Sequence, residues 1–217
     1  PAAVEEAAAS LVAKAEKVGR NASVQLAADK KSFEVTPAVV GHSVDPATFQ
    51  AVAEEAARSL SAATTTVTFV QTDPSVTTAA ATKVAAQANA IVARKVAVSD
   101  GAEKHTPSAK VRASWVSIPT TDGVPGTPTL DAKKVQKWVA AQAKDAKKEP
   151  SSGLRNVSAS GAVLSVVTEA RDGRVVANAD ALAEAASAAL VAGKDYSGEF
   201  DYDTVAASWR QRTVAVG

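Results

Sequence analysis

Three carboxylates near the C-terminus are the strongest candidates for chemistry in this sequence. Glu199, Asp201 and Asp203 alternate with two aromatic residues. Because alternate residues of a β-strand point to the same face, the carboxylates would share one face of a strand at residues 197–204. Such a cluster could bind a cation or work as an acid/base pair. The alternation with aromatic residues also fits a solvated sheet face, and the pattern favours this second interpretation.

The other residue types exclude most catalytic chemistry. The chain of 217 residues has no Cys, which rules out a disulfide, a thiolate metal site, an iron–sulfur cluster and a cysteine nucleophile. We expect the two histidines, His42 and His105, in solvent-exposed turns, since neither has a partner at metal-ligand spacing. No Gly-x-Ser-x-Gly motif and no glycine-rich phosphate loop occurs. We therefore predict no catalytic residue, metal ligand or cofactor, and no ligand-binding residue is identified.

Basic and aromatic side chains are weaker candidates for a binding surface. A lysine-rich helix could meet an anionic wall polymer or nucleic acid, although a plain solvated helix surface is favoured. The net charge of +1 predicts no nucleic-acid partner, and no apolar run reaches the roughly 20 residues of a membrane span. Trp115 and Trp138 lie on apolar helix faces and are predicted core residues, whereas Trp209 is predicted to dock against a downstream domain. The lysines are Lys133, Lys134, Lys137, Lys144, Lys147 and Lys148.

Alternating helical and strand patterns must position these residues. Apolar spacings of three and four predict a first helix from Val4 to Val18, with Gly19 as its C-cap. Two alternating stretches, at residues 23–28 and 32–36, predict a β-hairpin. Asp45 and Pro46 are a cap and first-turn signal for a second helix. A β-branched strand at residues 64–70 follows.

When the sequence is compared with itself at an offset of about 132 residues, the same order of predicted helices and strands occurs a second time. Asp131 caps a helix to about residue 147, and Gly173 matches Gly41. The chain is thus predicted to be α+β, with two repeats of helix-strand-strand-helix-strand and a helical connector. In the connector, Thr78 would cap a helix, and a short helix would start at Thr106-Pro107. The predicted boundaries are 1–77 for the first repeat, 78–128 for the connector and 129–217 for the second repeat. The remaining elements of the second copy are strands at 156–159, 163–168 and 197–204 and a helix at 179–191.

Three motifs of the first repeat resemble those of a known family. They are Phe33-Glu34-Val35-Thr36-Pro37, Gly41-His42-Ser43-Val44-Asp45 and Thr72-Asp73-Pro74-Ser75-Val76. In this order they resemble the peptidoglycan-binding domain that stands, often in tandem, before the catalytic domain of bacterial L,D-transpeptidases. The same domain also precedes the vancomycin-resistance W-type domain. The second copy departs from the pattern at Ala177-Asn178, where valine and aspartate would stand.

The resemblance implies a non-catalytic module that binds peptidoglycan, by its glycan or its stem peptide, and positions a cell-wall enzyme. Transpeptidase members carry a Ser-His-Gly-Cys nucleophile motif that maps onto no residue here, so the chemistry would belong to a downstream catalytic domain of the same polypeptide. The expected location is extracytoplasmic, at the bacterial cell wall. The first residue is Pro1, so we expect a processed or excised chain with any signal or anchor upstream. The alternatives are a structural spacer without ligand affinity and the same module in a W-type surface protein.

Overall fold

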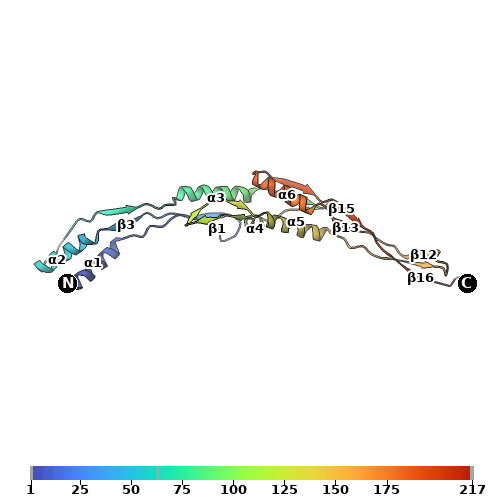
Figure 1. Cartoon of the computed structure of the whole chain (residues 1–217), viewed down its shortest axis with the longest axis horizontal. Helices are drawn as coiled ribbons and strands as arrows, with labels where there is room; N and C mark the ends of the chain where they lie inside the picture. The colour runs from blue at the N-terminus through green and yellow to red at the C-terminus, as the bar shows by residue number, and fades with distance from the viewer. Residues whose placement is uncertain (1, 63, 216–217) are drawn as a thin grey trace. The chain divides into compact units, whose positions relative to one another are not determined.

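The computed structural model describes residues 2–62 and 64–215. It has the predicted α+β character, with helices and small, mostly antiparallel sheets (Figure 1). The chain divides into two compact units, which are described separately. Unit 1 contains the residues up to Ala28 together with Ser32–Ala88 and Ile118–Pro128. Unit 2 contains Asp29–Lys31, Asn89–Ser117 and the residues from Thr129 on. The predicted domain boundaries after residues 77 and 128 stay a prediction.

Unit 1 contains two helices that lie side by side and three two-stranded sheets. The sheets pair β1 with β2, β3 with β4 and β8 with β9, all antiparallel, and the first is the predicted hairpin. Helix α3 (Thr78–Ala93) begins in this unit, and the division between the units falls after its Ala88. The other elements are α1 (Ala2–Ala15), β1 (Ser23–Leu26), β2 (Phe33–Thr36), β3 (Gly41–Val44), α2 (Pro46–Ser59), β4 (Phe69–Thr72), β8 (Thr120–Thr121) and β9 (Val124–Pro125).

Unit 2 contains a second pair of adjacent helices, α5 (Ala132–Ala146) and α6 (Ala179–Val191). Its sheets have the strand orders β12-β11-β16, β14-β5-β6, β13-β15 and β10-β7. Two of the pairings are parallel, β11 with β16 and β14 with β5. The other elements are β5 (Val96–Ser99), β6 (Lys104–His105), α4 (Ala109–Ser114), β7 (Val116–Ser117), β10 (Thr129–Leu130), β11 (Gly153–Val157), β12 (Val163–Thr168), β13 (Gly173–Val176), β14 (Tyr196–Glu199), β15 (Tyr202–Val205) and β16 (Trp209–Thr213).

The two units repeat the same order of elements, and each has a strand that the sequence did not predict directly before the second helix of the repeat. The series α1, β1, β2, β3, α2, β4 corresponds to α5, β11, β12, β13, α6, β15 at a shift of about 132 residues. The additional strands are β3 and β13, directly before the second helix of each repeat. Isolated bridges recur at the same shift: Lys17 pairs with His42 as Lys148 pairs with Arg174. The duplication that the sequence predicts is therefore visible in the pairing of the backbone.

A close contact between two backbone segments explains why β3 and β13 each begin with a glycine. A Cβ on Gly41 would lie 2.6 Å from the backbone nitrogen of Gly19. A Cβ on Gly173 would lie 2.6 Å from the nitrogen of Pro150 and would also collide with the carbonyl oxygen of Lys148. In each repeat, the chain that leaves the first helix passes too close to this strand for any side chain.

Local signals locate most helix starts correctly. Asp45 accepts a hydrogen bond from the N–H of Ala47 at 3.0 Å, and Asp131 accepts from those of Lys133 and Lys134. Two predicted starts are wrong by one or two residues. Thr77, rather than Thr78, accepts from the first turn of α3, and Ser108, rather than Thr106, caps α4.

The predicted end of the first helix is also wrong. Helix α1 stops at Ala15, and Val18 is exposed. Gly19 does not serve as a C-cap, because it lies against Gly41 instead. The bridge from Lys17 to His42 already belongs to the extended segment after the helix.

Among the described residues, unit 2 contains more of the buried apolar side chains than unit 1. Val135 and Val139 of α5 pack with Leu190 of α6 or with Phe200, in two clusters that also contain Val96 and Val98 of β5. In unit 1 a small cluster forms around Ala22, Val76 and Ala81, and no residue of α2 is buried. Among the described residues no helix is long and apolar enough to cross a membrane.

Candidate functional site

The predicted carboxylate face does not form, which corrects the first sequence hypothesis. The predicted strand at residues 197–204 is split into β14 and β15, with Phe200 buried at the break. β14 pairs with β5 and β15 pairs with β13, so no single strand carries Glu199, Asp201 and Asp203. All three are exposed, as a solvated surface requires. No group of three or more metal-ligand side chains occurs in residues 2–62 and 64–215.

Asn178 explains the break between the two strands. Its side-chain amide donates to the Glu199 carbonyl oxygen at 3.0 Å and to the Asp201 carboxylate at 2.8 Å. Its side-chain oxygen accepts from the Asp201 backbone N–H at 3.0 Å. Asn178 precedes α6 but makes no capping hydrogen bond. Asn178 therefore links the start of α6 to the segment between β14 and β15.

Neither histidine lies in a solvent-exposed turn, which is a second correction. His42 is half-buried in β3, with its ring edge-on to Phe69 at 4.9 Å between centroids. At the equivalent place in unit 2, the Arg174 guanidinium lies 4.1 Å above the Tyr202 ring. Both repeats therefore place a basic side chain against an aromatic ring, directly after the glycine.

His105 belongs to a small polar cluster in unit 2. Its Nε2 lies 3.2 Å from a carboxylate oxygen of Asp100. The backbone N–H groups of Glu103 and Ala102 donate to the same carboxylate at 2.7 and 2.8 Å. These two donors, with His105 as a smaller cause, lower the pKa of Asp100 from 3.8 to about 2. The Tyr202 hydroxyl donates to the Asp100 carbonyl oxygen and ties this turn to β15.

The lowered pKa predicts an acid-sensitive contribution to stability. A carboxylate whose folded pKa is depressed stabilises the fold above its unfolded pKa and loses this contribution as pH falls through its folded pKa. We expect the stability supplied by Asp100 to be complete above about pH 4 and to disappear toward pH 2. Asp100→Asn should therefore flatten the fall of unit 2 stability over this range. Denaturant unfolding at several pH values measures this, with Asp122→Asn in the exposed β8–β9 turn of unit 1 as the matched control. An unchanged acid slope in Asp100→Asn would contradict the assignment.

Of the two tryptophans predicted in the core, Trp115 is buried and Trp138 is half-buried against the core clusters. The Trp115 ring is edge-on to that of Trp138 at 5.9 Å. Trp209 is 37% exposed in β16, and its ring lies against Gly153 and beneath the Arg155 guanidinium. Its docking to a downstream domain stays a prediction.

Two of the predicted basic residues are paired with neighbouring groups. Lys134 lies 3.6 Å from the Asp131 carboxylate and donates to the Ser114 carbonyl oxygen, while Lys147 pairs with Glu149. Part of the predicted cationic surface is thus neutralised by neighbours on the same unit.

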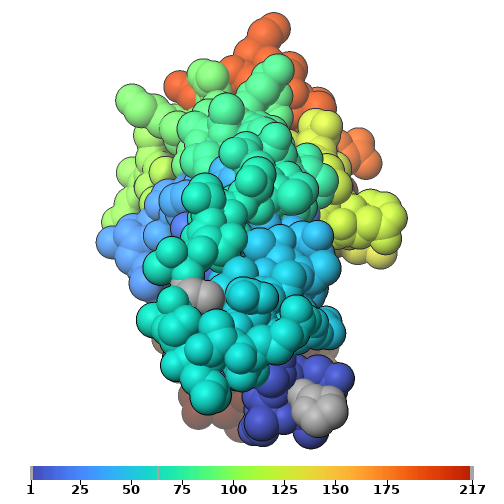
Figure 2. Space-filling model, turned by 90° about the vertical axis from the view of Figure 1, so that its left-hand side faces the viewer, coloured from blue at the N-terminus to red at the C-terminus, as the bar shows by residue number. Residues whose placement is uncertain are grey.

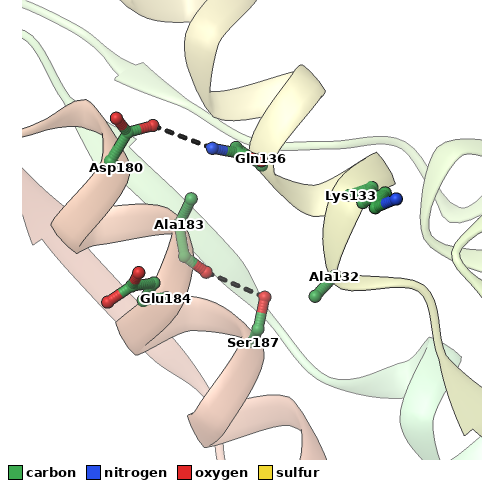
Figure 3. A pocket seen from close by; sticks show the side chains of 7 residues that line it. All are labelled: Ala132, Lys133, Gln136, Asp180, Ala183, Glu184 and Ser187. Carbon is green, nitrogen blue, oxygen red and sulfur yellow. Dashed lines mark hydrogen bonds between the residues drawn. The ribbon is translucent and has the colours of Figure 1, made fainter.

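A groove lies between α5 and α6 in unit 2 (Figure 3). It encloses about 330 Å³. Gln136 of α5 donates to Asp180 of α6 at 3.0 Å, and their side chains point toward each other across the groove. Ser187 bonds the Ala183 carbonyl oxygen of its own helix. The full lining is Ala132, Lys133, Gln136, Asp180, Ala183, Glu184 and Ser187.

The lining combines small apolar contacts with groups of opposite charge. Ala132 offers an exposed methyl group, and Gln136 offers an amide donor and acceptor. Glu184 and Lys133 carry opposite charges, and both are exposed. Such a surface suits a peptide-like ligand with amides, small side chains and charged ends, and it contains no nucleophile paired with a base.

Unit 1 has hollows at the corresponding place between α1 and α2. One of about 290 Å³ is lined by residues that include Glu5, Ala8 and Gln50, and another of about 310 Å³ includes Glu5, Gln50 and Glu54. At the repeat shift, Glu5, Gln50 and Glu54 stand where Gln136, Ala183 and Ser187 stand in unit 2. Figure 2 turns this part of unit 1 toward the viewer, with α1 in dark blue and α2 in lighter blue.

Sequence reasoning missed the groove, although it identified both of its helices. The residues that line it lie about 45 positions apart, and no local pattern shows that α5 and α6 lie side by side. The available signal was the alanine-rich face of both helices, which permits close approach. The recurrence of the same helix pair at the repeat shift strengthens that signal.

Comparison with known proteins yields little. No family model matches the chain, and no curated protein matches it significantly. Two solved structures are weakly similar: the Ldtfm–avibactam carbamoyl enzyme and a mutant of the Enterococcus faecium L,D-transpeptidase. Each match covers 57% of the residues of the present chain, with 21% sequence identity and a TM-score of 0.36. The chain covers less than half of each, 46% and 47% respectively.

Proposed function

We propose that this chain is a non-catalytic region that binds peptidoglycan and positions a cell-wall L,D-transpeptidase. The observation that carries the proposal is the groove between the paired helices, which occurs at the same place in both repeats. The family resemblance of the motifs around Gly41 supports it independently. The chain itself contains no Cys, so a cysteine-dependent transfer would need a separate catalytic domain.

The groove chemistry favours the stem peptide as the recognised part of the polymer. A stem peptide offers amides, small methyl side chains, a free carboxylate and, before crosslinking, an amine. In unit 2, Gln136 can bond the amides, Glu184 can pair with the amine and Lys133 with the carboxylate. Each hydrogen bond of this kind contributes about 1 kcal/mol, so binding at one groove is expected to be weak. Two grooves on one chain would raise the overall affinity for a repeating polymer.

Co-sedimentation with purified sacculi tests this proposal. The unchanged chain should be retained above an inert control protein. We expect the double variant Gln136→Ala/Glu184→Gln to reduce the affinity of unit 2 about tenfold, because it removes one amide and one charge. The matched control is Gln211→Ala/Glu169→Gln, which makes the same two changes at exposed positions outside the groove.

The outcomes of this experiment distinguish a peptidoglycan-binding module from a structural spacer without ligand affinity. Retention no better than the inert protein would leave a structural spacer as the function and would overturn the binding proposal. Equal retention of both double variants would place the contact elsewhere on the chain. A thermal unfolding curve of each variant confirms that it remains folded.

A further inference from the structure

Unit 2 contains a strand pairing that has no counterpart among the described residues of unit 1. β14 is paired in parallel with β5, through Tyr196 N–H to the Lys95 carbonyl oxygen and Phe200 N–H to that of Ser99, both at 2.9 Å. At the repeat shift of this region, residues 64–67 stand where Ser197–Phe200 stand. In the described part of unit 1, no strand pairs with residues 64–68.

The pairing with β5 also completes the core of unit 2. Val96 and Val98 of β5 are fully buried and belong to the two clusters that cover α5 and α6. β5 therefore supplies both backbone partners for β14 and apolar side chains for the helix pair. Without it, the inward faces of α5 and α6 would lose the contacts of two fully buried valines.

In unit 1, where the described residues include no strand equivalent to β5, the segment before β4 and helix α2 remain largely exposed. The segment Thr64-Thr65-Thr66-Val67-Thr68 is β-branched throughout, as a strand prefers, yet it is not in a strand. Phe69 is 52% exposed and Val70 61% exposed, directly after this segment. Helix α2 has no buried residue. The predicted strand at residues 64–70 is thus wrong in its first five residues for want of a partner.

We propose that residues 64–68 accept an extended strand of the β5 type, in parallel, as β14 accepts β5. The occupant is a polypeptide segment with small apolar side chains at alternate positions, on the pattern Val-Ala-Val-Ser of β5. Its valines would lie over α1 and α2, as Val96 and Val98 lie over α5 and α6. Strand addition of this kind gains affinity from main-chain hydrogen bonds and specificity from alternate side chains. The inference does not depend on wall binding.

A synthetic peptide tests the proposal directly. A labelled peptide with the sequence of residues 94–101 should bind the full chain saturably in fluorescence anisotropy. The same peptide with aspartate in place of both valines should bind at least tenfold more weakly, since buried charges replace apolar contacts. Hydrogen exchange should show new protection at residues 64–68. Protection confined to another strand edge, such as β12, would overturn the proposal.

Two proline variants test whether the backbone N–H groups of residues 64–68 bind the peptide, and each serves as the control for the other. Residues of a paired strand turn their N–H groups alternately toward and away from a given neighbour. Val67 stands where Phe200 donates to β5, so Val67→Pro should abolish peptide binding. Thr66→Pro removes an N–H that faces the other way and should retain it. Equal binding by both variants would overturn the proposal. Self-association of the chain through residues 64–68, seen in sedimentation velocity without peptide, would also overturn it, because the occupant would then be a second copy.

Discussion

Gly173→Ala is expected to destabilise unit 2 by about 3 kcal/mol, at the upper end of the usual cost of overpacking. The added Cβ would lie 2.6 Å from the Pro150 nitrogen and against the Lys148 carbonyl oxygen, and both are backbone atoms that cannot rotate away. Gly41→Ala should destabilise unit 1 for the same reason, because its Cβ would meet the backbone of Gly19. Urea unfolding followed by separate probes for each unit measures both effects.

The control for this prediction is another Gly→Ala substitution in unit 2. Gly161 has a φ of +85° and no atom near the place of its Cβ. Gly161→Ala should cost only the roughly 1–2 kcal/mol of a left-handed backbone. If Gly173→Ala costs no more than Gly161→Ala, the close approach of the two backbone segments is not what keeps the glycine in both repeats.

Leu190→Ala should destabilise unit 2 by about 3 kcal/mol, because it leaves a cavity in the cluster beneath α6. Leu190 is 1% exposed and packs with Val96, Trp115 and Val135. A loss of this size is a large fraction of the stability of a small domain, so the variant should also lower the midpoint of thermal unfolding by several degrees.

Leu60→Ala provides the same chemical change at an exposed site. Leu60 follows α2 and is 92% exposed, so its truncation should change stability by less than about 0.5 kcal/mol. Near-equal effects of the two substitutions would mean that Leu190 is not part of a packed core. Calorimetry of both variants measures the difference.

Features encoded by neighbouring residues were predictable from the sequence. The caps at Asp45 and Asp131 depend on two or three adjacent residues, and both form as predicted. The hairpin of β1 and β2 needs only two alternating stretches and a turn. The repeat was visible because the order of such local signals recurs, and the backbone bridges confirm it.

Features that depend on distant partners were not predictable. The strand at residues 197–204 breaks at Phe200 because Asn178 holds the break and β5, about 100 residues earlier, pairs with only its first part. His105 is half-buried because Asp100 faces it across a turn. The segment at residues 64–68 has strand composition and no strand partner. The candidate groove likewise arises from the packing of α5 on α6, which no local pattern reports.

An NMR titration of the ¹⁵N-labelled chain with a soluble disaccharide–stem-peptide fragment tests wall-polymer binding most directly. We predict saturable shifts at the backbone amides of Lys133, Gln136, Asp180 and Ser187, and at those of Gln50 and Glu54 in unit 1. The Gln136→Ala/Glu184→Gln variant should lose most of the unit 2 shifts and keep those of unit 1. No saturable shift at any residue, or shifts confined to surfaces away from both helix pairs, would contradict the account.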